Sequence, residues 1–323
     1  MANLKHLGIS GGGTKISGLF GAAEVVIFDK NYRPDLISGI SAGAILAVPL
    51  AMAMHHNDIR EKIKEKVLNL KQSDFFNRAP VTEEGAVKKL NALLKIVFGE
   101  SALGEQENLK KTISEIIGRT EFARYVNDNK YPVCIVGTVD FYTGKRFYFN
   151  LKKVGYEHFL EFVNASGSLP IFTPGYATTD ILFDFENETN GYTKALLFDG
   201  GVRDHSPTAK ILESETYRHK IKENVTIFSR PAQVENILDP KDFEGKKDIL
   251  KILARYVDIT NAEVSKNDQE REAGLADMLK LVAHRTIFLP RILRDVYDIN
   301  PQKLKELYEA GKKAVVEQWN PVA

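Results

Sequence analysis

The spacing of apolar residues alternates between two periods over the first 56 positions. Two short apolar runs, at residues 4–10 and 36–37, are too brief for helices and predict buried strands. Each run is followed by a segment with apolar residues three or four positions apart, at 16–27 and at 42–56, which predicts a helix. Pro49 stands inside the second of these segments and should kink that helix or remove one backbone hydrogen bond. This opening is typical of a parallel sheet covered by helices.

The middle of the chain predicts more helices and then further strands. Residues 57–130 are rich in charge and mostly helical in pattern. Two β-rich runs flank the turn at 142–144, which predicts a hairpin. Residues 164–176 have the composition of a loop, and two later apolar runs, at 195–201 and 224–231, predict strands.

From Lys246 onward the pattern is helical and amphipathic. The chain contains no internal repeat, low-complexity tract or obvious linker. We therefore expect one domain over residues 1–323, with a motif-bearing core at 4–231 and a helical part at 246–323.

The composition narrows the functional class only slightly. A formal net charge of +1 gives the chain no overall attraction to nucleic acid. The single cysteine, Cys134, lies in an apolar run and is expected to be a small buried residue. The longest apolar run, at 44–54, is shorter than the roughly 20 residues that a membrane span needs. We expect a cytoplasmic protein whose contact with membranes, if any, is transient and peripheral.

The sequence Gly39-Ile40-Ser41-Ala42-Gly43 matches Gly-x-Ser-x-Gly, a pattern that often places a nucleophilic serine on a sharp turn between a strand and a helix. One candidate for the base that activates Ser41 is a histidine in a Ser-His-Asp triad, with His205 as the first choice. However, only forty residues precede Ser41, whereas the nucleophile of α/β-hydrolases follows several strands.

A second candidate base is Asp199, which ends an apolar run and precedes two glycines. A carboxylate at a strand end of a parallel sheet points into the crevice where ligands bind, although Asp-Gly alone is also a common turn. A third element is the loop Gly11-Gly12-Gly13, whose backbone N–H groups can face a developing negative charge at the start of a helix. The same loop does not fit a phosphate-binding loop, since Lys15 is followed by Ile16, and it fits a dinucleotide fingerprint only loosely.

Together, these motifs resemble the signature of the patatin-like phospholipase family. They are Gly11 to Lys15, Gly39 to Gly43 and Asp199 to Gly201, in that order along the chain. The segment from Asn164 to Pro170 also resembles the serine- and proline-containing segment that this family has between its nucleophile and its aspartate. The resemblance covers residues 4–231 well and the C-terminal helices only vaguely.

The resemblance implies a three-layer α/β/α sandwich with a mainly parallel central sheet. It implies a Ser-Asp dyad without histidine, in which Ser41 is the nucleophile and Asp199 the general base, and an oxyanion hole from the N–H groups of Gly11, Gly12 and Gly13. It also implies hydrolysis of lipid acyl esters, of the phospholipase A, lysophospholipase or esterase type, with no metal or cofactor. Three neighbouring residues are candidate substrate contacts: Lys15, Ala42 and Gly200.

The chain departs from the family pattern at three positions. Ile16 stands where the family usually has glycine, His205 where it usually has asparagine before a proline, and Pro49 lies in the helix behind the nucleophile. Two other functions therefore stay open: a patatin-like binding or regulatory protein with little turnover, and a Ser-His-Asp esterase.

Substrate contacts outside the motifs are only weakly indicated. Aromatic residues could line an acyl channel, but aromatics at such spacing are more often core. These are Phe75, Phe76, Phe141, Tyr142, Phe147, Tyr148, Phe149, Phe172 and Tyr176. Helices around 57–118 could form a lid, although charged helices are usually solvated faces.

Overall fold

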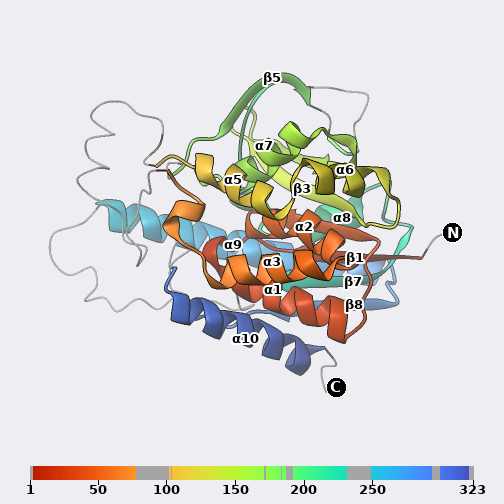
Figure 1. The fold of residues 1–323 in the computed structure, drawn as a ribbon. Helices are drawn as coiled ribbons and strands as arrows, with labels where there is room; N and C mark the ends of the chain where they lie inside the picture. The colour runs from red at the N-terminus through yellow and green to blue at the C-terminus, as the bar shows by residue number, and fades with distance from the viewer. Residues whose placement is uncertain are drawn as a thin grey trace.

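A mixed sheet of eight strands forms the centre of the molecule (Figure 1). The computed structural model describes residues 3–77, 102, 104–170, 172–182, 184–186, 192–230, 249–292 and 299–319. The strands run in the order β5-β6-β3-β2-β1-β7-β8, and β4 pairs with β3 beside this path. Their bounds are β1 Leu4–Ile9, β2 Leu36–Ile40, β3 Val133–Asp140, β4 Arg146–Asn150, β5 Tyr176–Leu182, β6 Tyr192–Asp199, β7 Ile221–Phe228 and β8 Ala283–Phe288.

Five neighbouring strands, β3, β2, β1, β7 and β8, are parallel, whereas β4 and β6 pair with β3 in the antiparallel direction. All five residues of β2 are buried. A strand at the centre of a parallel sheet is covered on both faces, and its residues are therefore apolar or small without alternation.

Helices cover both faces of the sheet. Their bounds are α1 Ile16–Glu24, α2 Ala42–Ala53, α3 Asn57–Leu68, α5 Glu107–Ile116, α6 Arg119–Asn127, α7 Tyr156–Ser166, α8 Thr208–Glu213, α9 Ile249–Met278 and α10 Pro301–Gln318. The larger apolar core includes residues of α1, α2, α3, α5, α6, α7 and α10. A smaller core joins α8 and the end of α9 to the opposite face, where Leu36, Ile40 and Ile135 lie. The predicted α/β/α architecture with a mostly parallel sheet is confirmed.

Most of the predicted elements are present. The opening strand–helix–strand–helix unit is β1, α1, β2 and α2, and the hairpin around 142–144 is formed by β3 and β4. Pro49 lies inside α2, which continues to Ala53, and the kink or lost hydrogen bond expected there stays a prediction. Part of the charged segment from 57 to 130, residues 78–101 and 103, lies outside the described residues.

Two predictions were wrong. The segment after Lys246 is not entirely helical, because β8 joins the sheet beside β7 between α9 and α10. The stretch predicted as a loop from 164 begins inside α7, which continues to Ser166. In each case the local pattern was overridden by packing against the rest of the fold.

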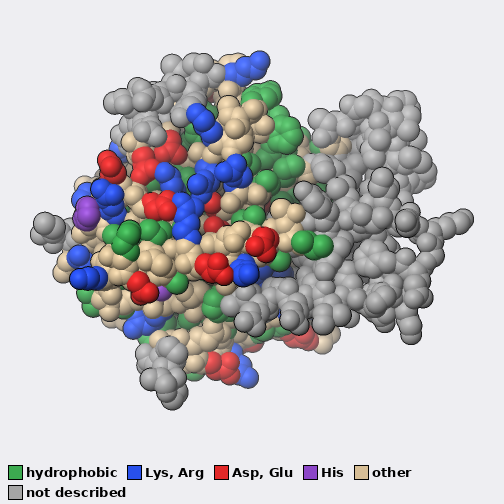
Figure 2. All heavy atoms as spheres, turned by 180° about the vertical axis from the view of Figure 1, so that it is seen from behind, with side chains coloured by type: hydrophobic (Ala, Val, Ile, Leu, Met, Phe, Trp, Pro, Cys, Tyr) green, Lys and Arg blue, Asp and Glu red, His purple; other side chains and the backbone are tan. Residues whose placement is uncertain are grey.

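The described surface carries intermixed charges. Figure 2 shows Lys and Arg side chains interspersed with Asp and Glu across the face opposite to the view of Figure 1, with hydrophobic side chains gathering near its upper edge. This mixture agrees with the formal net charge of +1. No helix in the described part of the chain is apolar over a length sufficient to span a bilayer.

Candidate active site

The three glycine-containing motifs meet in one cleft at the carboxyl edge of the parallel strands. The cleft measures about 810 Å³, including its solvent-open mouth. It is lined by residues from the loops after β1 and β2, from the start of α5, from the segment after α7 and from the end of β6. Ligands bind at this edge in open α/β sheets.

Ser41 occupies a strained turn between β2 and α2. Its backbone has φ 54° and ψ −120°, a conformation that costs free energy for any residue with a Cβ. The turn is tight enough that a Cβ on Gly39 would lie 2.2 Å from the carbonyl oxygen of Gly43. A Cβ on Gly43 would in turn lie 2.2 Å from the carbonyl oxygen of Ile9. The Gly-x-Ser-x-Gly pattern is therefore required sterically on both sides of the serine.

Ser166, the last residue of α7, stabilises this turn by two hydrogen bonds. Its hydroxyl accepts a hydrogen bond from the Ser41 N–H at 2.9 Å and donates one to the Gly137 carbonyl at 2.6 Å. The side chain is fully buried. Ser166, in the segment Asn164 to Pro170 that resembles a family motif, thus supports the backbone of the candidate nucleophile.

Asp199 lies at the cleft, but its strand runs in the opposite direction from the one predicted. It ends β6, which is antiparallel to β3, so it does not lie at the carboxyl end of a parallel strand. Where β3 pairs with β6, Thr138 lies opposite Asp199. Where β3 pairs with β2, the preceding residue Gly137 lies opposite Ile40, so β6 ends beside the end of β2. The Asp199 N–H also donates to the carbonyl of Ser168. The last residue of α7 and the segment after it therefore contact Ser41 and Asp199, respectively.

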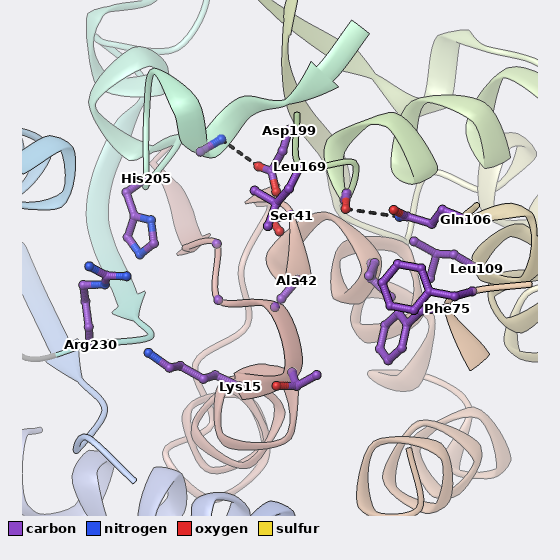
Figure 3. Close-up of a pocket in the computed structure, with 18 residues that line it drawn as sticks. Lys15, Ser41, Ala42, Phe75, Gln106, Leu109, Leu169, Asp199, His205 and Arg230 are labelled. Atoms are coloured by element: carbon purple, nitrogen blue, oxygen red, sulfur yellow. Dashed lines mark hydrogen bonds between the residues drawn. The ribbon is translucent and has the colours of Figure 1, made fainter. Parts of the chain in front are cut away.

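The Asp199 carboxyl group is buried beside Ser41 (Figure 3). It accepts a hydrogen bond from the Gly201 N–H at 2.7 Å. Burial raises the pKa of Asp199 to about 7, although the Gly201 N–H and the neighbouring Ser41 side chain act to lower it. A carboxylate with this pKa is a much better proton acceptor near neutral pH than one in water.

The glycine loop packs against Ser41, since a Cβ on Gly11 would lie 3.3 Å from the Ser41 Cβ. Gly13 has φ 54°, and a Cβ on Gly12 would lie 2.7 Å from the Cβ of Ser229, so a side chain at either position would be strained. The Gly11 N–H donates to the His205 carbonyl at 2.9 Å. All three glycines line the cleft.

His205 lies near the nucleophile but points elsewhere. Its Nε2 is 3.3 Å from the Ser229 hydroxyl, and Figure 3 shows the ring directed toward Arg230. Burial, together with the positive charges of Arg230 and Lys15, holds the pKa of His205 well below its usual range. The imidazole is therefore neutral and a poor base.

The two ends of the cleft differ in chemistry. Lys15 and Arg230 lie at one end, and Phe75 and Leu109 line the other, as Figure 3 shows. Of the other candidate contacts, Ala42 lines the cleft at the start of α2. Gly200 is buried against β3, where a Cβ would meet the Gly137 carbonyl at 2.8 Å.

The aromatic residues fall into four groups. Phe75 and Phe76 line the cleft, as one of the two interpretations expected. Phe147, Tyr148 and Phe149 are buried in the cores, as the other expected. Tyr176 packs partly buried against the larger core, and Phe172 is also half-buried. Phe141 and Tyr142 are exposed to solvent.

Two carboxyl groups that no motif indicated support the site from α9. Asp268 accepts hydrogen bonds from the N–H groups of His205 and Ser206, and Glu272 accepts one from the Ser206 hydroxyl. They fix the loop that follows the Asp-Gly-Gly motif. Burial raises the pKa of Asp268 to about 7 and that of Glu272 to about 8. Among the described residues, no cluster of three or more His, Cys, Asp or Glu side chains could hold a metal ion.

Comparison with known proteins agrees with the motifs. The sequence profile of the patatin-like phospholipase family matches residues 7–212. Among curated proteins, none matches this sequence.

Two solved structures are similar to this chain at low identity. VipD from Legionella pneumophila is 13% identical with a TM-score of 0.41, and the match covers 97% of this chain and 66% of VipD. ExoU from Pseudomonas aeruginosa, in complex with SpcU, is 16% identical with a TM-score of 0.35, and the match covers 86% of this chain and 53% of that one. The chain therefore spans only about two thirds and half of these two proteins. On the profile match, which covers more than half of its length, the chain belongs to the patatin-like phospholipase family, a family of lipid hydrolases.

Proposed function

We propose that the protein is a serine hydrolase that cleaves carboxylic esters of lipids through a Ser41–Asp199 dyad and an acyl-enzyme. The observation that carries the proposal is the position of the Ser41 side chain beside the buried carboxyl group of Asp199, whose pKa is about 7 (Figure 3). A serine hydroxyl is a weak nucleophile until an adjacent base accepts its proton.

The reaction follows from these positions. Asp199 accepts the hydroxyl proton as the Ser41 Oγ attacks the ester carbonyl carbon, and the carbonyl electron pair moves to its oxygen. The intermediate collapses to an acyl-enzyme, and the leaving alcohol takes the proton from Asp199. A water molecule, deprotonated by Asp199, then attacks the acyl carbon and releases the fatty acid with regeneration of Ser41.

The oxyanion needs donors on the side of the glycine loop. Because the Gly11 N–H already donates to His205, we assign this role to the N–H groups of Gly12 and Gly13. The helix that starts at this loop adds its dipole. The apolar end of the cleft, with Phe75 and Leu109, suits an acyl chain, and the cationic end, with Lys15, suits a polar head group.

A Ser-His-Asp mechanism is disfavoured by the same geometry. The ring of His205 is hydrogen-bonded to Ser229, and its pKa is lowered by burial and by two cations. Replacement of His205 by glutamine should therefore leave much of the turnover, whereas a triad would lose nearly all of it.

The decisive experiment is active-site labelling. A fluorophosphonate should label the wild-type protein at Ser41, and the Ser41→Ala variant should stay unlabelled. Equal labelling of both proteins would reject the proposal. If neither reacts, and short- and long-chain esters are not hydrolysed, a binding or regulatory role becomes the better interpretation.

A further inference from the structure

Three exposed hydrophobic side chains lie in two segments next to the Asp-Gly-Gly motif. Phe141 and Tyr142, in the turn between β3 and β4, are 62% and 58% exposed, and Val202, in the segment after β6, is 40% exposed. We call these three residues the aromatic tip. Clustered apolar side chains on a surface usually mark a contact site, because exposing them to water costs free energy.

The tip is held outward by an ordered scaffold. The buried Asp140 carboxylate accepts hydrogen bonds from the N–H groups of Tyr142 and Thr143 and from the Thr143 hydroxyl. The Phe141 N–H donates to the Leu196 carbonyl, and its ring packs against Phe198 with centroids 5.4 Å apart. The exposure therefore belongs to the folded backbone and is not the result of a frayed turn.

A hydrogen bond joins the two parts of the tip. The Arg203 guanidinium donates to the Gly144 carbonyl at 3.1 Å, which connects the segment after Asp199 to the turn of the hairpin. Val202 directly follows Gly201, which lines the cleft. The aromatic tip therefore adjoins the candidate active site.

Three exposed cations lie near the tip, and the exposed Asp180, in the β5 segment beside Lys194, is hydrogen-bonded to His158. Lys145, Lys194 and Arg203 are exposed, and the Lys194 ammonium lies 5.7 Å from the centre of the Tyr142 ring. Two carboxylates of the same region, Asp140 and Asp204, are buried and accept hydrogen bonds. Aromatic rings bordered by Lys and Arg are suited to the interface of an anionic bilayer, where the rings enter the head-group layer and the cations meet lipid phosphates.

We propose that the aromatic tip docks this protein on anionic lipid surfaces. Docking at the tip would place the carboxyl edge of the sheet, and with it the mouth of the cleft, against the bilayer. The proposal rests on the proposed function only for what the docked protein does there, since binding needs no turnover.

The test is sedimentation of the Ser41→Ala protein with lipid vesicles. One set contains phosphatidylcholine with about a third phosphatidylglycerol, and the other contains phosphatidylcholine alone. We expect the protein to bind the anionic vesicles, and the added change Phe141→Ser/Tyr142→Ser to weaken binding by about tenfold or more. Lys194→Gln/Arg203→Gln should weaken it several-fold at low salt, with a smaller difference at high salt.

The matched control is Met278→Ser/Val282→Ser. These side chains are 68% and 79% exposed, and Val282 directly precedes β8 at the opposite, amino edge of the sheet. The control should bind vesicles as the parent does. Thermal unfolding of each variant within a few degrees of the parent would confirm that the fold is retained.

Several results would overturn the inference. It fails if the parent does not bind anionic vesicles, or if the tip and control variants bind equally well. A concentration-dependent dimer in sedimentation that only Phe141→Ser/Tyr142→Ser abolishes would assign the tip to a second copy of this chain. Vesicle binding by a wild-type protein that hydrolyses no ester would reject the proposed function but retain the docking surface.

Discussion

The two halves of the candidate site are stabilised by different means. On the side of Ser41 and the glycine loop, backbones approach so closely that only glycine fits at Gly39 and Gly43. On the side of α9, the loop after Asp199 is held by the carboxyl groups of Asp268 and Glu272, which accept hydrogen bonds from it. The first half lies within the family match at residues 7–212, and α9 lies outside it. The family motifs therefore indicate the glycines that close packing requires. They do not indicate the side chains of α9 that hold the site by hydrogen bonds.

The largest expected effect is that of Asp199→Asn. Asparagine can still accept the Gly201 N–H but cannot take the Ser41 proton, so turnover should fall by about 10³-fold while the fold is retained. Because the pKa of Asp199 is about 7, the kcat/KM of the wild type should fall about tenfold per pH unit below that value and level off above it. Ester hydrolysis across pH 5 to 9 measures both. A wild-type profile that is flat below about pH 7 would contradict the assignment of Asp199 as the base.

The next largest effect should come from Gly43→Ala. The added Cβ would lie 2.2 Å from the Ile9 carbonyl oxygen, a backbone atom that cannot move aside, so the stability should fall by about 3 kcal/mol or more and activity should be lost. Urea unfolding and fluorophosphonate labelling measure the two losses. Gly155→Ala provides the control, since nothing lies within 4 Å of its Cβ position. Equal stability of the two variants would show that the turn tolerates a side chain.

Ser166→Ala tests whether the brace under the nucleophile matters for chemistry. It leaves the buried Ser41 N–H and Gly137 carbonyl without their shared partner, which should cost about 1–3 kcal/mol of stability. A small displacement of Ser41 should also lower kcat by about tenfold to a hundredfold, with less change in KM. Ser168→Ala is the matched control, because Ser168 contacts Asp199 through its backbone carbonyl and not through its hydroxyl. The brace is purely structural if kcat is unchanged once folding is complete.

These predictions also show which parts of the site were accessible from sequence. Gly39, Ser41 and Gly43 are close together in the chain, and their residue types alone indicate a sharp turn. That Asp199 lies beside Ser41 came from resemblance, and the direction of its strand was wrongly expected, because residue patterns do not encode strand direction.

The supporting residues were missed for a different physical reason. Asp268 and Glu272 lie in an amphipathic helix, where acidic residues normally indicate a solvated face, and the partners of Asp268 are backbone N–H groups that no residue type marks. The strand β8 was missed because His284, Arg285 and Thr286 interrupt its apolar run, as is common in a strand at the edge of a sheet.

Glu272→Gln examines the bracing half. A carboxyl group whose pKa is raised in the folded state binds more protons when folded, so the free energy of unfolding should fall as the pH rises from 4.5 to about 8. Glutamine still accepts the Ser206 hydroxyl but cannot ionise, so the variant should lose much of this slope and be the more stable protein at pH about 9. Urea unfolding at acidic and alkaline pH measures the slope. The control is Glu215→Gln, whose side chain is 90% exposed, and an unchanged slope in Glu272→Gln would mean that Glu272 does not ionise in this range.

The smallest expected effect is the change in stability caused by Gly274→Ala, which tests directly whether the two halves of the site differ in their dependence on glycine. Gly274 is a glycine of α9 with nothing within 4 Å of its Cβ position, in contrast to Gly43. Alanine at that position should restrict the unfolded chain and favour the helix, so Gly274→Ala should stabilise the protein by about 0.5–1 kcal/mol without loss of activity. Differential unfolding in urea can resolve a change of this size. Destabilisation by Gly274→Ala would mean that α9 also depends on glycine for close packing, and the contrast between a steric half and a side-chain-braced half would no longer hold.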